Sequence, residues 1–136
     1  MEYAHISGKR KEAIARTTIR PGNGIIRVNS MLFEHYMPRL ARERIRQVLI
    51  LAEGFIDLSK IDIDIISEGG GFMGQAEAIE CSLARSLVAY TGSDQLKDVF
   101  VKYDRTLIAG DHRQTEVHKP SQSSSGPRHK KQKSYR

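Results

Sequence analysis

Lysine and arginine are the residues of this sequence best suited to do chemistry, and the chemistry is the binding of phosphate groups. The 136 residues include 22 Lys or Arg and 16 Asp or Glu, for a net charge of +6. Residues 1–117 carry equal numbers of the two signs, so the whole excess lies beyond them. A positive surplus confined to one end of a chain favours a polyanionic partner. That end has no acidic residue, and its six basic residues are Lys119, Arg128, Lys130, Lys131, Lys133 and Arg136.

A second group of basic residues lies near the N-terminus, within 19 positions that contain one acidic residue, Glu12. Cations on a strand are often merely solvated, but this density favours a phosphate-binding surface. The group consists of Lys9, Arg10, Lys11, Arg16, Arg20 and Arg27.

Residues 118–136 contain no Leu, Ile, Val, Phe or Met, so they have almost nothing to bury. Ordering them would cost about 1 to 2 kcal/mol of backbone entropy per residue, which only a binding partner could offset. We predict a globular body over residues 1–117 and a basic tail over residues 118–136 that is disordered unless it is bound to RNA. Tyr135, between Lys133 and Arg136, suits base stacking combined with phosphate pairing. A tail that only keeps the protein soluble is the alternative.

The stretch GGGFMG at residues 69–74 suggests a different phosphate chemistry, because it fits the dinucleotide-binding pattern G-x-G-x-x-G. A dinucleotide site also needs a parallel βαβαβ sheet with an acidic residue at the end of its second strand. Asp94 has a suitable spacing, but it follows a helix stop at Gly92 and is predicted to open another helix. A purely structural turn fits better, as does a turn that also touches RNA backbone through Gly69, Gly70, Gly71, Gly74 and Gln75.

No other group of residues assembles a catalytic or metal site. Asp62 and Asp64 could hold a divalent cation or do acid–base chemistry, but nothing nearby supplies further ligands or a base. We expect them to be solvated on an edge strand. Cys81 has no histidine near it in sequence, and the five histidines lack ligand spacing. We therefore predict no enzymatic activity, no metal, no cofactor and no small-molecule substrate.

The location is predicted from two further patterns. The longest apolar run, Val48–Ala52, is too short to cross a membrane, and the N-terminus lacks a signal-peptide pattern. A single cysteine excludes an intrachain disulfide framework. We expect a cytoplasmic protein with no membrane partner.

The phosphate-binding residues need a scaffold, and the hydrophobic pattern predicts both strands and helices. Residues 11–20 alternate as a strand whose buried side is Ala13, Ala15, Thr17 and Ile19. The turn PGNG at 21–24, with positive φ expected at Gly22, should return the chain as the hairpin partner IIRVN. Residues 60–66 should form a strand with one isoleucine-rich face. Helices are predicted over 39–52 behind Pro38, over 75–90, and over 94–103 with Leu96, Val99, Phe100 and Tyr103 buried.

Four stretches together resemble one known family: SGKRKEAIARTTIRPGNGIIRVNS, GGGFMGQAEAI with SLARSLVAY, YDRTLIAGDHR, and the terminal QKSYR. In order and spacing they are similar to the ninth protein of the small ribosomal subunit, in its archaeal and eukaryotic form. The resemblance implies an α+β fold with a mostly antiparallel sheet and helices packed on one face. It also implies a left-handed βαβ crossover, against the general right-handed preference, and a long extended basic C-terminal tail.

The resemblance also implies a function and the residues that perform it. Members of that family bind the 3′ major domain of small-subunit rRNA, which forms the subunit head, beside neighbouring ribosomal proteins. Their tail extends to the anticodon stem-loop of the P-site tRNA. In this sequence the tRNA-binding residues would be Lys133, Ser134, Tyr135 and Arg136. The rRNA-binding residues would be Lys9, Arg10, Lys11, Arg16, Arg20, Arg27, Arg113, Lys119, Arg128, Lys130 and Lys131.

One departure from the family lies in the middle of the tail. Between Lys119 and Arg128 this sequence has PSQSSSGP, where related proteins usually carry more glycine and arginine. We expect weaker phosphate contacts there, or contacts from hydroxyl groups instead. Two other functions stay open: a free-standing RNA chaperone or regulator that uses the same surface, and a nucleotide-dependent enzyme built on GGGFMG.

Overall fold

The computed structural model describes residues 3–117, which form an α+β body with a five-stranded sheet and four α-helices. The predicted tail, residues 118–136, lies outside the described residues. The strands are β1 (Ala4–Arg10), β2 (Ala13–Pro21), β3 (Ile26–Val28), β4 (Met31–Leu32) and β5 (Ile61–Glu68). The helices are α1 (Arg39–Ala52), α2 (Phe72–Thr91), α3 (Asp94–Tyr103) and α4 (Thr106–Ala109), with short 3₁₀ turns at Phe33–His35 and Leu58–Lys60.

The described sheet is mixed and mostly antiparallel, with the strand order β1-β2-β5-β3-β4. The pairs β1–β2, β2–β5 and β3–β4 are antiparallel, whereas β3 and β5 run parallel. The chain passes from β3 to β5 by way of α1, so these elements form a βαβ unit. The hand of this crossover stays a prediction.

The predicted hairpin between residues 11–20 and 25–29 is wrong. The antiparallel partner of β2 is instead β1, with Ala4 opposite Ile19, and this strand was not predicted. On its other side β2 pairs with β5, which separates it from β3. The loop that follows Pro21 is bound to the start of β5, because the backbone N–H of Gly22 donates to the carbonyl of Lys60 at 2.9 Å. The positive φ of this loop is at Gly24, at 81°, and not at Gly22.

The expectation that residues 60–66 form an edge strand is also wrong, since β5 lies in the middle of the sheet. Its alternation is confirmed: Ile61, Ile63 and Ile65 are buried, while the side chains between them face the open side. A strand with three buried isoleucines gains more apolar burial at the centre of a sheet than at its edge. That preference explains why β5 separates β2 from β3.

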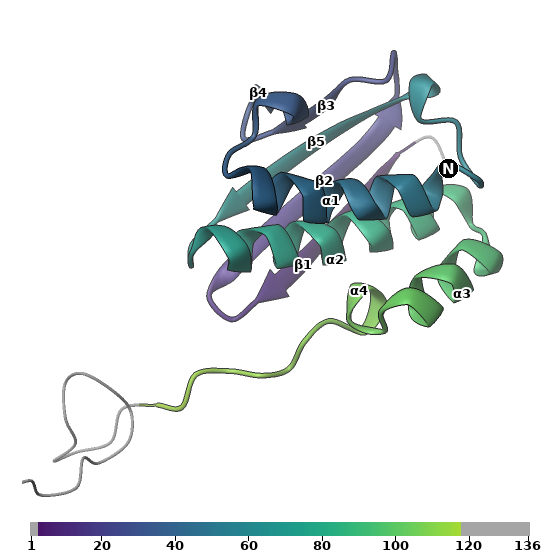
Figure 1. Cartoon of the computed structure of the whole chain (residues 1–136). Helices are drawn as coiled ribbons and strands as arrows, with labels where there is room; N and C mark the ends of the chain where they lie inside the picture. The colour runs from purple at the N-terminus through teal and green to yellow at the C-terminus, as the bar shows by residue number, and fades with distance from the viewer. Residues whose placement is uncertain (1–2, 118–136) are drawn as a thin grey trace, which may run out of the picture.

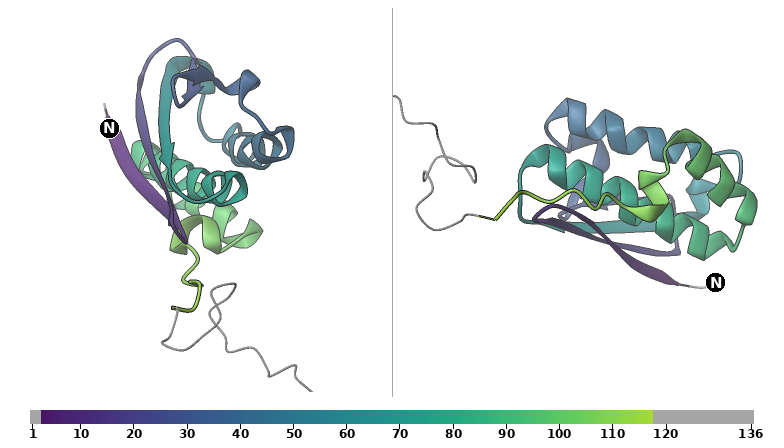
Figure 2. Two further views of the ribbon diagram at one scale, coloured as in Figure 1. Left: turned by 90° about the vertical axis from the view of Figure 1, so that its left-hand side faces the viewer. Right: turned by 90° about the horizontal axis from the view of Figure 1, so that it is seen from below.

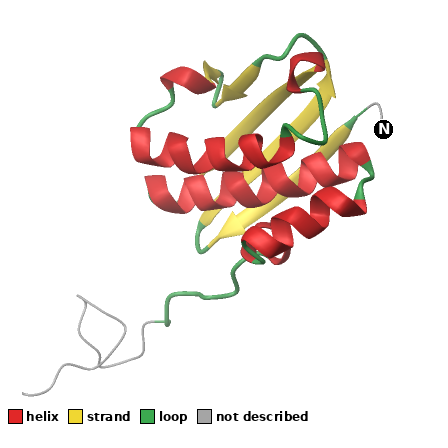
Figure 3. Ribbon diagram, turned by 45° about the vertical axis from the view of Figure 1, so that its right-hand side comes forward, coloured by secondary structure: helices red, strands yellow, loops and turns green. Residues whose placement is uncertain are grey.

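Helices α1 and α2 lie side by side over one face of the sheet and leave the other face open (Figures 1 and 2). The predicted helix over residues 39–52 is confirmed, with Pro38 at its N-cap. The stripe predicted to enter the core is buried throughout, and it consists of Ala41, Ile45, Val48, Leu49 and Ala52. Figure 3 shows the same two layers coloured by secondary structure.

Helix α2 lies in close contact with the backbone of β1 at Gly8. A Cβ atom added there would lie 2.4 Å from the carbonyl oxygen of Ala78 and 2.6 Å from the amide nitrogen of Ser82. Only glycine permits this backbone-to-backbone contact. The hydroxyl groups of Thr17 and Ser82 share a buried hydrogen bond of 2.7 Å at the same interface. The contacts at Gly8 and Thr17 set the distance between α2 and the strands β1 and β2.

The C-terminal part of the body is helical. Asp94 opens α3 as predicted, with Ser93 at the N-cap. Leu96 and Phe100 are buried as predicted, but Tyr103 is 54% exposed and its hydroxyl donates to Gln47. Helix α4 was not predicted. No strand follows β5 in residues 3–117, so the described topology lacks the parallel βαβαβ sheet of a dinucleotide site.

Residues 3–117 lack two features that would point to other functions. No helix there has the length and apolar character that a membrane crossing requires. No group of three or more His, Cys, Asp and Glu side chains in the same range is placed to hold a metal ion.

Candidate nucleic-acid interface

Three predicted binding segments that are far apart in sequence meet at one end of the sheet. The β1–β2 turn carries Lys11 and Glu12, and the turn that ends β5 packs against it: a Cβ atom added at Gly69 would lie 2.6 Å from the carbonyl oxygen of Glu12. The C-terminal segment reaches the same end, where Arg10 Nη1 donates to the carbonyl oxygen of Arg113 at 3.2 Å. In Figure 1 this is the end at which the chain leaves the body.

The turn at residues 69–71, which we call the glycine turn, has a conformation that its packing explains. Gly69 and Gly70 have φ angles of 72° and 62°, in the left-handed region that favours glycine. Gly71 is the N-cap of α2, and Gly74 and Gln75 belong to its first turns. The side-chain amide of Gln75 donates to the carbonyl oxygen of Gly69 at 3.0 Å, which closes the turn. A structural role is sufficient to account for these glycines, and RNA contact there stays a prediction.

Two of the predicted rRNA-binding residues, Arg10 and Arg113, are engaged in ion pairs that we call the clamp, together with Glu77 and Asp111. Arg10 Nε lies 2.5 Å from Glu77 Oε2, and Arg10 Nη2 lies 3.3 Å from Asp111 Oδ2. Arg113 Nη2 lies 2.5 Å from the same Asp111 oxygen. Hydrogen bonds from Arg113 hold the pKa of Asp111 well below its usual range. The clamp therefore ties the start of the C-terminal segment to β1 and α2.

The clamp continues into the helix layer through Arg44 on α1. Its guanidinium lies 3.0 Å from Glu77 Oε1 and 3.1 Å from Glu80 Oε1, so α1 and α2 are joined by charge as well as by apolar packing. Burial raises the pKa of Glu80, and this outweighs the opposite effect of Arg44. Only 9% of the Glu80 side chain is exposed.

The open side of the sheet carries Arg16, Arg20 and Arg27 together with acidic side chains of β5, and we call this surface the sheet face. Arg16 Nη1 lies 3.1 Å from Glu68 Oε1. Asp64 is shared, because Arg20 Nη2 lies 2.8 Å from one of its oxygens and Arg27 Nη1 lies 3.6 Å from the other. These two carboxylates thus offset much of the positive charge of the surface that was predicted to be basic.

Asp62, the third acidic residue of the sheet face, has a structural role. Its Oδ1 accepts hydrogen bonds from the backbone N–H groups of Asn23 at 2.8 Å and Ile25 at 3.0 Å. These two donors lower the pKa of the carboxyl group. Asp62 thus binds the β2–β3 loop to β5.

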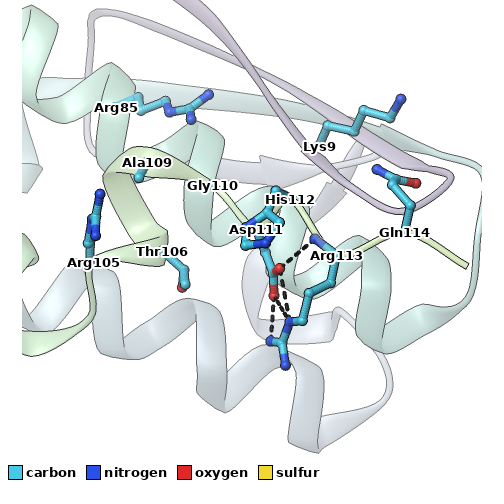
Figure 4. Close-up of a pocket in the computed structure, with 10 residues that line it drawn as sticks. All are labelled: Lys9, Arg85, Arg105, Thr106, Ala109, Gly110, Asp111, His112, Arg113 and Gln114. Atoms are coloured by element: carbon cyan, nitrogen blue, oxygen red, sulfur yellow. Dashed lines mark hydrogen bonds and ion pairs between the residues drawn. The ribbon is translucent and has the colours of Figure 1, made fainter.

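A hollow of about 660 Å³ lies where the C-terminal segment leaves α4, and we call it the exit hollow (Figure 4). Among the described residues that line it, Asp111 is the only acidic one, and its carboxylate accepts hydrogen bonds from Arg113. Lys9 and Arg105 are exposed, and their side chains have no carboxylate partner among residues 3–117. The lining residues are Lys9, Arg85, Arg105, Thr106, Ala109, Gly110, Asp111, His112, Arg113 and Gln114.

Arg85 forms the rigid part of this lining. Its Nε donates to the carbonyl oxygen of Ile108 at 2.7 Å and its Nη1 to that of Ser7 at 3.4 Å. Its Nη2 lies under Gly110, where an added Cβ atom would be 3.2 Å away. Gly110 has a φ of 78°, so a side chain there would also be strained. The guanidinium is thereby fixed against backbone carbonyls and carries a charge that no described carboxylate neutralises.

Cys81, which lies near the same hollow, is a buried thiol. Burial raises its pKa, so the unreactive thiol form is favoured.

Sequence reasoning missed Arg85, Arg105 and His112 as candidate binding residues. One signal was available for Arg85, since it is a cation within SLARSLV, where the neighbouring helix positions are buried. No comparable signal marks Arg105. The predicted residues Lys119, Arg128, Lys130, Lys131, Lys133, Ser134, Tyr135 and Arg136 lie outside the described residues.

Comparison with known proteins gives consistent matches over the whole chain. The family model described as ribosomal protein S9/S16 matches residues 8–136. The small ribosomal subunit protein uS9 of Methanococcus maripaludis (strain C7) is 46% identical over 136 residues, which cover all of both chains. The protein of the same name from Methanococcus vannielii is 44% identical over the same full length.

Proposed function

The chain belongs to the ribosomal protein S9/S16 family, and from this premise we propose how its charged surfaces serve the small ribosomal subunit. As a member it is a structural ribosomal protein and not an enzyme. We place it in the ribosome of the cytoplasm, with small-subunit rRNA and ribosomal proteins of the subunit head as its partners. The observation that carries the proposal is the full-length match to small-subunit proteins.

For the body, the proposed ligand is the 3′ major domain of small-subunit rRNA. Support comes from the gathering of Lys9, Lys11 and the glycine turn at one end of the sheet, next to the exit of the C-terminal segment. Arg10 and Arg113 then act chiefly by holding that segment in place. Arg16, Arg20 and Arg27 contribute less, because each would exchange a carboxylate partner for a phosphate.

For the tail, the proposed ligands are rRNA phosphates followed by P-site tRNA. The support is the sequence: six basic residues without any acid, ending in Lys133, Ser134, Tyr135 and Arg136. We propose that these last four residues approach the anticodon stem-loop, and that Lys119, Arg128, Lys130 and Lys131 contact rRNA on the way.

Deletion of residues 119–136 tests the electrostatic part of the proposal. If six tail charges each neutralise a phosphate, the plot of log affinity against log salt should flatten by about 4 to 5, at roughly 0.7 to 0.9 per contact. The measurement is a salt titration of binding to a transcript of the rRNA 3′ major domain. An unchanged slope would refute the tail contacts.

Deletion of Arg136 alone tests the tRNA contact. Small subunits should still incorporate the variant at near one copy each, but they should bind P-site tRNA more weakly. Unaltered tRNA binding would show the terminal residue to be dispensable. If the parent chain did not sediment with small subunits at all, a free-standing RNA regulator would become the better explanation.

A further inference from the structure

We propose that the exit hollow is a seat for RNA backbone in which Lys9, Arg85 and Arg105 contact phosphate groups. This inference rests on the proposed function and deepens it, because it assigns rRNA contacts to Arg85 and Arg105. Both residues belong to the helical part of the body, outside the N-terminal basic group and the tail.

The cations of the exit hollow differ from those of the sheet face in whether a carboxylate is paired with them. A cation already paired with a carboxylate gives up that partner to bind phosphate, whereas an unpaired one binds without such a loss. Arg16, Arg20 and Arg27 are all paired. Lys9 and Arg105 have no carboxylate partner among residues 3–117, and Arg85 is bonded only to backbone carbonyls.

Asp111 and Arg85 also allow an anion to bind in the hollow. Asp111, the one carboxylate among its described lining residues, is paired within the clamp, so it is not free to repel a phosphate or to bind Lys9. Arg85 Nη2 makes no hydrogen bond with any described residue, and its position is fixed by the two bonds of the other nitrogens. A preorganised donor of this kind loses little entropy when it binds.

The side chains of the hollow suit the sugar–phosphate backbone of RNA better than its bases. Among the described residues that line the hollow there is no Phe, Tyr or Trp and His112 is the single aromatic side chain, so little surface is available for base stacking. Gly110 leaves its middle uncovered by a side chain, which permits close approach. The hydroxyl of Thr106 and the amide of Gln114 are suited to sugar hydroxyl groups. A volume of about 660 Å³ exceeds what a single phosphate fills, which suits a stretch of chain.

The chain segment that lines the hollow leads on to the tail. Residues 110–114 line the hollow, and the chain then continues toward residues 118–136 with their six basic side chains. RNA bound in the hollow would therefore lie beside the start of the segment proposed to follow it. The clamp fixes where this segment leaves the body.

The test uses the full chain with the exposed residues Lys9→Gln and Arg105→Gln, because Arg85 is half-buried and bonded to the fold. Binding to a transcript of the rRNA 3′ major domain is measured from low to moderate salt. Two lost phosphate contacts should reduce the slope of log affinity against log salt by about 1.4 to 1.8. The conservative pair Lys9→Arg and Arg105→Lys should restore the parent slope.

Lys97→Gln with Lys102→Gln is the matched control, since both lysines lie on α3 outside the hollow and the net charge changes equally. Its slope should stay near that of the parent. Acetylation of lysines in the parent, read by mass spectrometry, should slow several-fold at Lys9 when the transcript is bound, and not at Lys97.

The outcomes separate the two claims. Equal slopes for the hollow variant and the control, or unaltered acetylation of Lys9, would overturn the seat while leaving rRNA binding intact. Failure of the parent chain to bind the transcript would overturn the proposed function, and the seat with it. Thermal unfolding of each variant checks that the fold is retained.

Discussion

The sheet face and the exit hollow contain similar side chains in opposite electrostatic states. Arg16, Arg20 and Arg27 lie on the sheet face, where each is paired with Asp64 or Glu68. In the exit hollow, Lys9 and Arg105 have no carboxylate partner among the described residues, and Arg85 contacts only carbonyls. The density of basic residues along the sequence is higher for the sheet face, but the free positive charge is in the hollow.

The difference shows that a count of cations is not a map of the surface potential. Cross-strand neighbours decide how much of each charge is available to a ligand. The same holds within the N-terminal basic group: Lys9 and Lys11 are exposed, whereas only 13% of the Arg10 side chain is exposed. We expect the three residues to differ in role, although they are adjacent in sequence.

The largest expected effect on stability comes from the clamp, whose Asp111 and Arg113 line the exit hollow. Arg10→Gln would remove the cation that Glu77 and Asp111 share, although Glu77 keeps Arg44 and Asp111 keeps Arg113. We expect a loss of about 1 to 2 kcal/mol in the free energy of unfolding, below the value for a buried pair that loses its only partner, because both carboxylates keep a cation and Glu77 is 31% exposed. Urea denaturation at neutral pH measures it.

Arg16→Gln is the counterpart on the sheet face. Its pair with Glu68 is exposed on both sides, so the loss should be below about 1 kcal/mol. Equal losses for the two variants would mean that the clamp does not hold the C-terminal segment to the body.

A smaller effect should follow from making the sheet face resemble the exit hollow. Asp64→Asn with Glu68→Gln would free three arginines for phosphate binding. On a single-stranded RNA of arbitrary sequence, we expect the slope of log affinity against log salt to steepen by up to about 2. A filter-binding salt titration measures this change.

The control for this experiment is Glu53→Gln with Asp98→Asn, because neither acidic residue forms an ion pair among residues 3–117. It changes the net charge equally without freeing an arginine. If both double variants steepened the slope alike, general charge and not unpairing would be responsible.

The smallest expected effect is a change of folding stability with pH. This change should have opposite signs in the helix layer and on the sheet face. The pKa of Glu80, which is paired with Arg44 next to the clamp, is raised by burial, so its contribution to stability is present below about pH 4.3 and is lost as pH rises through the folded-state pKa. The stability of Glu80→Gln relative to the parent should therefore increase as the pH rises from 4 to 7. Urea unfolding across that range gives the difference.

Asp62→Asn provides the contrast from the sheet face. Hydrogen bonds lower the pKa of Asp62, so its contribution is present above about pH 3.9 and is lost as pH falls through the folded-state pKa. The variant should be less stable than the parent at pH 7, and the deficit should shrink toward pH 2. The same sign of pH dependence in both variants would contradict the assigned environments.

Periodicity predicted the parts of the fold that depend on neighbours along the chain. The bounds of α1 and its buried stripe follow from spacings of three and four residues. The alternation of β2 and β5 follows from a period of two. The strand β1 was missed because AHISGKR mixes glycine, histidine and charge, and its burial depends on α2 packing onto Gly8.

The sequence by itself determined the segregation of charge, the buried stripes of the helices and the resemblance to a ribosomal family, because each depends only on residue type and local spacing. Tertiary structure alone decided which charges are free. Arg16 and Glu68 are 52 positions apart and Arg20 and Asp64 are 44 apart, and they pair only because β5 lies beside β2. The exit hollow likewise joins residues 9, 85, 105–106 and 109–114, whose proximity is set by packing of α2 and α4 and not by any spacing in the chain.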